Sequence, residues 1–75
     1  MEFPITFLKS GETAEIANLH GEPGWVGRLA ELGLIAGKKI RMLQPGATFL
    51  LDLGDSRVSL GIPASGEILV RQLPL

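Results

Sequence analysis

The sequence predicts a small, mainly β protein of about five short antiparallel strands and one short α-helix. Apolar residues alternate with polar ones in several short segments, which is the period of a half-buried strand. Turns that contain glycine or proline separate these segments, and only one segment has helical spacing. Short strands joined by tight turns cannot make a doubly wound parallel sheet, so we expect a partly closed barrel.

A helix is predicted from about Pro23 to about Leu32. Trp25, Leu29 and Leu32 are spaced i, i+4, i+7 and therefore share one face. Pro23 suits the first helical position, where a missing N–H leaves no hydrogen bond unmade. A helix this short is unstable alone in water, so we expect its apolar face to pack on the core.

Gly33 is predicted to end this helix. Glycine accepts the left-handed conformation at the position after a helix, and a Schellman ending would fold Leu34 back onto Leu29. Gly37 then allows a second turn before residues 38–43, where apolar and charged residues alternate. The sequence therefore predicts a helix, a cap and a turn into a strand.

Strand patterns occur at residues 13–19, 38–43, 49–53, 58–60 and 68–71. In the first of these, Ala14 and Ile16 are predicted to face the core, and Ala17 to face away. Gly54 and Asp55 have the composition of a two-residue hairpin turn. With one inserted helix, these strands fit an SH3-like barrel.

The chain has 75 residues and is expected to form a single domain, residues 1–75. It contains no cysteine, which fits a reducing compartment. No apolar run approaches the roughly 20 residues of a membrane span, and Met1–Pro4 lacks the basic start of a secretory signal. We therefore expect a soluble, cytoplasmic protein with no direct membrane insertion.

Metal, cofactor and enzyme chemistry have little support. His20 is the one histidine, and with Glu22 alone it does not make a transition-metal site. Asp52 and Asp55 flank the predicted hairpin and are interpreted as turn residues, because two carboxylates fall short of a hard-cation site. The serines have no base beside them in sequence, and no phosphate-binding loop is present. We expect no metal, no cofactor and no catalysis.

Lys38, Lys39 and Arg41 form the one basic cluster. A nucleic-acid-binding barrel would combine such a cluster with aromatic platforms, but the aromatic residues are scattered and the net charge is −1. We interpret the cluster as a solvated strand edge and predict no nucleic-acid binding.

The chain resembles the FeoA domain, the small cytoplasmic component of bacterial ferrous iron transport systems. Residues 8–12, Leu-Lys-Ser-Gly-Glu, are similar to the family's opening Leu-Lys-Pro-Gly-Glu. Residues 28–37 carry the spacing Arg-Leu-x-x-Leu-Gly-Leu-x-x-Gly between two predicted strands. One departure is at Gly61, where the family commonly has the arginine of Ala-Leu-Arg. The resemblance implies an SH3-like barrel interrupted by a short helix.

The resemblance also implies an accessory role in ferrous iron uptake, with docking on the cytoplasmic part of the FeoB-type membrane iron permease. It does not imply that iron binds to this chain. The alternative is an SH3-like protein-interaction or metal-dependent regulatory module that is not tied to transport, because fold alone does not decide function.

Protein docking or self-association as a homo-oligomer is favoured by the apolar content of 45%. Arg28 and Glu31 are expected on the outer face of the helix, and Leu50 interrupts the alternation of its strand. We predict these three residues as partner contacts. The C-terminal residues 73–75, Leu-Pro-Leu, are a second candidate.

Overall fold

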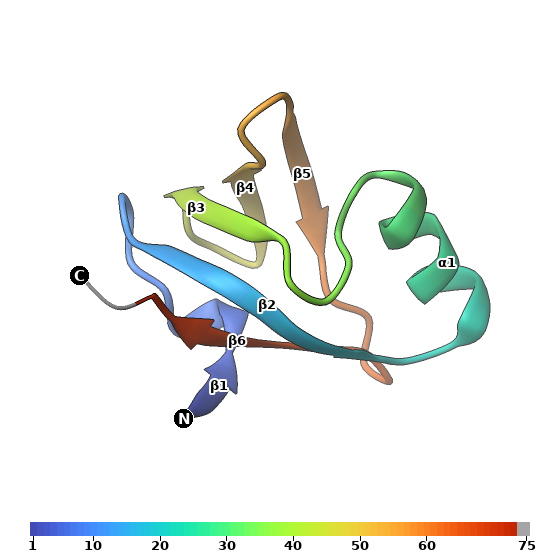
Figure 1. Ribbon diagram of the computed structural model, residues 1–75. Helices are drawn as coiled ribbons and strands as arrows, with labels where there is room; N and C mark the ends of the chain where they lie inside the picture. The colour runs from blue at the N-terminus through green and yellow to red at the C-terminus, as the bar shows by residue number, and fades with distance from the viewer. Residues whose placement is uncertain (74–75) are drawn as a thin grey trace.

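The computed structural model describes residues 1–73, and the predicted Pro74 and Leu75 contacts lie outside them. This part of the chain forms one open antiparallel sheet, in the order β1-β6-β2-β3-β4-β5, with one α-helix beside it (Figure 1). The predicted mainly β, SH3-like architecture is confirmed. In chain order the elements are β1 (Glu2–Pro4), η1 (Ile5–Phe7), β2 (Thr13–His20), α1 (Pro23–Glu31), β3 (Lys39–Gln44), β4 (Thr48–Asp52), β5 (Arg57–Gly61) and β6 (Glu67–Gln72).

The open sheet is built around β2, which pairs with β6 on one side and with β3 on the other. The register of β2 against β6 shifts between Ile16 and Asn18, as in a β-bulge, which bends a strand and increases its twist. The extra residue is Ala17, which is buried, so its predicted outward position is wrong. The bulge places Ile16 and Ala17 in the interior together.

The core is entirely apolar. Alternate residues of the strands point inward, as Phe49 and Leu51 do on β4, and no polar side chain among the described residues is buried. The largest fully buried side chains come from all parts of the chain: Ile5, Ile16, Leu34, Met42, Phe49, Leu51, Ile68 and Val70. Apolar burial is therefore the main stabilising contribution to this fold.

A sixth strand, β1, was not predicted. It has only three residues and includes Pro4, and it pairs with β6 through Glu2 opposite Arg71 and Phe3 opposite Val70. No alternation can be read in so short a segment, and proline is confined to edge strands of a sheet. Here β1 is an edge strand, and the turn that follows carries Ile5 into the core.

Helix α1 begins at Pro23, as predicted, and packs one face on the core. Leu29 is 3% exposed and Trp25 is partly buried against the core cluster. Leu32 is 50% exposed, so its predicted core position is wrong. It is the C-cap residue, where the chain leaves the helix and turns away from the helical face.

The helix ends in the predicted Schellman motif. The N–H of Gly33 donates to the carbonyl of Ala30 at 2.9 Å, and the N–H of Leu34 donates to that of Leu29 at 2.8 Å. Gly33 has a φ of +96°, a left-handed conformation that residues with a side chain rarely adopt. As a result Leu34 enters the core fully buried, beside Leu29.

Both ends of α1 are held close to the segments that flank β5. A Cβ added to Gly66, in the loop after β5, would lie 2.8 Å from the Trp25 ring. At the other end, a Cβ added to Gly33 would lie 3.9 Å from a methyl group of Leu53, which closes the β4–β5 hairpin by donating to Ser56. Helix α1 therefore lies beside β5, at the open side of the sheet (Figure 1).

We expect Gly33→Val to lower the free energy of unfolding by about 1 to 3 kcal/mol, the cost of holding a side-chain-bearing residue in this region. Because only a Leu53 methyl lies within 4 Å of an added Cβ, the cost comes from the backbone and not from a clash. Gly27→Ala, inside α1 with open space around its Cβ, should instead stabilise by about 0.5 to 1 kcal/mol. Urea unfolding measures the free energy of unfolding of both variants. Equal changes for Gly33→Val and Gly27→Ala would contradict the left-handed cap at Gly33.

Leu29→Ala should destabilise by about 2 to 5 kcal/mol, since it opens a cavity in the core. Leu32→Ala removes the same atoms from a half-exposed side chain in the same helix, and we expect a change within about 0.5 kcal/mol. Chemical denaturation of the two variants compares core with surface directly. Similar losses for both would place Leu32 in the core after all.

Candidate functional site

The described residues, 1–73, contain no group of three or more His, Cys, Asp or Glu side chains that could hold a metal ion. His20 is the last residue of β2, and it is exposed opposite Glu67 of β6. A transition metal would want several imidazole, thiolate or carboxylate ligands together. These residues bring no such donor set together, so surface features become the candidates.

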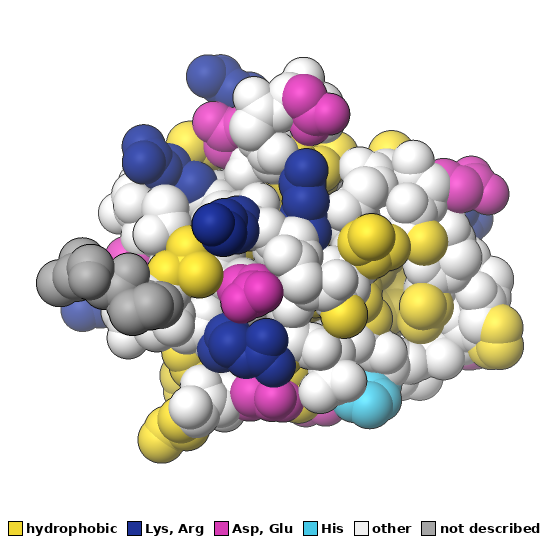
Figure 2. Space-filling view, in the orientation of Figure 1, with side chains coloured by type: hydrophobic (Ala, Val, Ile, Leu, Met, Phe, Trp, Pro, Cys, Tyr) yellow, Lys and Arg dark blue, Asp and Glu magenta, His cyan; other side chains and the backbone are white. Residues whose placement is uncertain are grey.

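The first surface feature lies on α1 and the turn that follows it. Arg28 and Glu31 are exposed there, as predicted, and Leu32 and Ile35 are 50% and 52% exposed. Figure 2 shows apolar side chains gathered on the side of the molecule where α1 and the turn into β3 lie. We call Arg28, Glu31, Leu32 and Ile35 the helix surface. Exposed apolar side chains bordered by charged ones are typical of a protein-interaction site.

Leu50 lies elsewhere. It is on the outward side of β4, half-buried, and its cross-strand neighbours are Gln44 of β3 and Ser59 of β5. The structure therefore places two of the predicted contact residues on α1 and the third among polar residues of the sheet. The apolar part of the helix surface, Leu32 and Ile35, was missed because its exposure depends on the direction the chain takes after Gly33.

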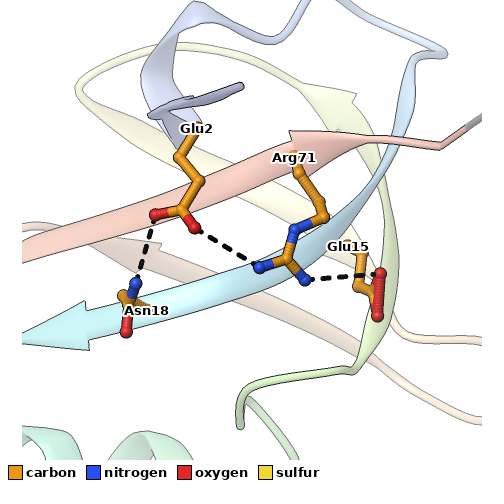
Figure 3. A network of polar contacts seen from close by, with 4 residues as sticks. All are labelled: Glu2, Glu15, Asn18 and Arg71. Atoms are coloured by element: carbon orange, nitrogen blue, oxygen red, sulfur yellow. Dashed lines mark hydrogen bonds and ion pairs between the residues drawn. The ribbon is translucent and has the colours of Figure 1, made fainter.

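Charged residues on the outer face of the sheet form a network centred on Arg71 (Figure 3). The Arg71 guanidinium of β6 lies 3.3 Å from the Glu2 carboxylate of β1 and 3.6 Å from the Glu15 carboxylate of β2. The Asn18 side-chain amide donates to the other oxygen of Glu2 at 3.1 Å. The network joins three neighbouring strands, but its members are partly exposed, so each ion pair adds little stability.

The basic cluster does not form a sheet edge, and that interpretation is wrong. Strand β3 lies between β2 and β4, and the edges of the sheet are β1 and β5. Lys39 lies opposite Glu15 and Arg41 lies opposite Asp52 in the strand register, with both cations exposed on the outer face. The physical reason is that alternation places charged residues on the solvent side of a central strand as readily as on an edge strand.

None of the helices in the described part of the chain is long and apolar enough to cross a membrane.

Comparison with known proteins identifies a family and a fold. A family model described as the FeoA domain matches residues 3–72. A solved structure, described as the crystal structure of the iron uptake regulatory protein FeoA, superposes with a TM-score of 0.83 at 24% identity and covers 97% of this chain and 100% of that chain. No curated protein matches the sequence significantly. At this identity the structural likeness shows a shared fold.

We expect Arg71→Gln to lower the free energy of unfolding by at most about 1 kcal/mol at low salt, because it removes two partly exposed ion pairs. The difference should shrink in about 1 M salt, where the screening length falls to about 3 Å. Arg57→Gln is the control, since Arg57 forms no ion pair within residues 1–73. Equal urea midpoints for the two variants at low salt would contradict the network's contribution.

Proposed function

Because the chain belongs to the FeoA domain family, we propose that it is a non-enzymatic accessory protein of ferrous iron uptake that docks on the cytoplasmic part of a FeoB-type iron permease. Family membership itself points to iron uptake and its regulation. The observation that carries the proposal is the match of the FeoA domain model to residues 3–72.

The surface of the molecule supports a protein-docking role over a metal-binding role. The described residues form no metal-binding cluster, whereas Leu32 and Ile35 present apolar side chains to solvent next to Arg28 and Glu31. Apolar side chains in a partner-facing position contribute affinity when they are buried, and bordering charges fix orientation. The helix surface is therefore our first choice of docking site, with Leu50 as a separate contact on the sheet.

One position separates this chain from the common family pattern. Gly61 stands where the family usually has an arginine, and it is exposed at the end of β5. A Cβ added there would lie 3.2 Å from the carbonyl oxygen of Ala47, which would have to shift slightly to accept a side chain. A partner contact made through that arginine is therefore absent from this chain.

A regulatory role outside transport is the second candidate. The structurally similar FeoA protein is named as an iron uptake regulatory protein. An SH3-like interaction module acting on a soluble regulator would use the same kind of exposed surface, but its partner would have no membrane component.

A pull-down from solubilised native membranes tests the proposal and its docking site. The tagged protein should recover the permease, and the charge-swapped variant Arg28→Glu, Glu31→Arg with Ile35→Ser should reduce recovery at least about tenfold, as loss of a partly buried apolar contact and two charge contacts implies. Leu50→Asp tests the sheet contact separately. The matched control is the swap Arg57→Glu, Glu67→Arg, which preserves net charge and alters exposed residues outside the helix surface.

Recovery of the permease by the wild type and the control swap, but not by the helix variant, supports the proposal. Recovery of soluble proteins alone by the wild type would favour the regulatory alternative. Equal recovery by all variants would remove Arg28, Glu31 and Leu50 from the docking site while leaving the accessory role in place.

A further inference from the structure

A second surface feature is an open hollow on the outer side of the sheet, at the start of β3. Its lining includes the cationic residues Lys38, Lys39 and Arg41, one carboxylate, Asp52, and the half-buried apolar residue Leu73. Figure 2 shows Lys and Arg side chains over the region of β3 and β4. Three cationic side chains are thus concentrated at one place in a protein whose net charge is −1.

The first of the outward-facing cations, Lys39, has a carboxylate opposite it that is already engaged. Glu15 is its cross-strand neighbour on β2, but the Glu15 carboxylate lies 3.6 Å from Arg71, on the other side of that strand. Lys39 itself forms no ion pair within residues 1–73. The Arg71 network therefore leaves the Lys39 ammonium free for an external anion.

Within residues 1–73, Arg41 also forms no ion pair with the carboxylate opposite it. Its cross-strand neighbour is Asp52 on β4, and an Asp52 carboxylate oxygen accepts a hydrogen bond of 2.8 Å from the N–H of Gly54 in the hairpin turn. No ion pair joins Arg41 to Asp52 in the described part of the chain. Guanidinium groups bind carboxylates in a planar, two-bonded geometry, so Arg41 is a suitable anchor for an incoming carboxylate.

The hollow also borders the helix surface. Gly37 is part of its lining, and the N–H of Lys38 donates to the carbonyl of Ile35 at 3.1 Å. The hollow therefore starts within three residues of the exposed Ile35 side chain along the chain. Along the chain, only Ala36 separates Ile35 from the first lining residue after it, Gly37.

The lining distinguishes between two kinds of anionic partner. A single-stranded nucleic acid needs aromatic side chains on which its bases stack, and none of the described residues that line the hollow is aromatic. The half-buried Leu73 offers an apolar contact for an aliphatic side chain, whereas Leu53 is 4% exposed and belongs to the core. Carboxylates next to an aliphatic residue fit this combination better than phosphates and bases do.

We propose that this hollow receives an acidic segment of the partner protein, with carboxylates bound by Lys39 and Arg41 and an aliphatic side chain placed against the half-buried Leu73. The inference rests on the proposed function, since it assumes that the chain docks on a protein. It adds the chemistry of the segment that the partner must present. Electrostatic complementarity of this kind gives specificity and a faster association rate.

The test measures binding of the full chain to the purified cytoplasmic region of the permease, using wild type, Lys39→Gln/Arg41→Gln, and the control Lys9→Gln/Arg57→Gln. Both variants lose two positive charges, and the control residues do not line the hollow. We expect the hollow variant to raise the Kd about tenfold, as two exposed ion pairs together allow, and the control to change it less than about threefold.

A second arm uses probes that do not depend on the permease. Amide NMR shifts of the labelled protein are followed during titration with a short peptide of alternating glutamate and leucine, and with a single-stranded RNA of equal charge. Peptide-induced shifts at β3 and Leu53 that vanish in Lys39→Gln/Arg41→Gln would support the proposal even if the permease region does not bind, an outcome that would refute the proposed function alone.

Equal Kd values for the hollow and control variants would overturn the inference while leaving the accessory role standing. Absence of peptide shifts at the hollow, or stronger shifts there with RNA than with the peptide, would also overturn it. Thermal unfolding of both double variants checks that they remain folded, and both should keep a wild-type melting temperature because all four residues are exposed.

Discussion

The left-handed turn at Gly33 is the constraint on which the core and the outer surface both depend. The turn lets the N–H of Leu34 reach the carbonyl of Leu29, so two leucines five positions apart enter the same core. Because the chain reverses there, Leu32, just before Gly33, and Ile35, just after Leu34, stay outside. One backbone conformation thus separates the apolar residues that stabilise the protein from those left to contact a partner.

Competition for carboxylates has a similar effect on the charged face of the sheet. Acidic and basic residues lie opposite one another across several strands, yet Arg71 is the cation that holds Glu2 and Glu15 within ion-pair distance. Asp52 is engaged by a backbone N–H in its own turn. Exposed ion pairs contribute little to the free energy of unfolding. The choice of partner for each carboxylate therefore matters mainly because it decides which cations are left to bind an external anion.

Residues with local signals were predictable from the sequence, and residues placed by long-range pairing were not. The cap at Gly33 and the hairpin at Gly54 depend on a few neighbouring positions, and both were foreseen. The burial of Ala17 depends on a bulge in the pairing of β2 with β6, about fifty positions away in sequence, and alternation cannot reveal it. The central position of β3 was not predicted for the same reason, because the sequence of one strand does not determine its place in the sheet.

The helix surface and the hollow would contribute two different kinds of interaction to recognition, apolar burial and electrostatic attraction. Leu32 and Ile35 can bury apolar area, which is where binding affinity mostly comes from, while their charged neighbours Arg28 and Glu31 carry opposite signs. The hollow is lined by three cationic side chains and one carboxylate, Asp52, so its net positive charge favours an acidic partner over a basic one across about 8 to 10 Å at physiological salt. A small protein with an entirely apolar core has only its surface for recognition, and adjoining apolar and cationic areas would let it select a partner without a deep cleft.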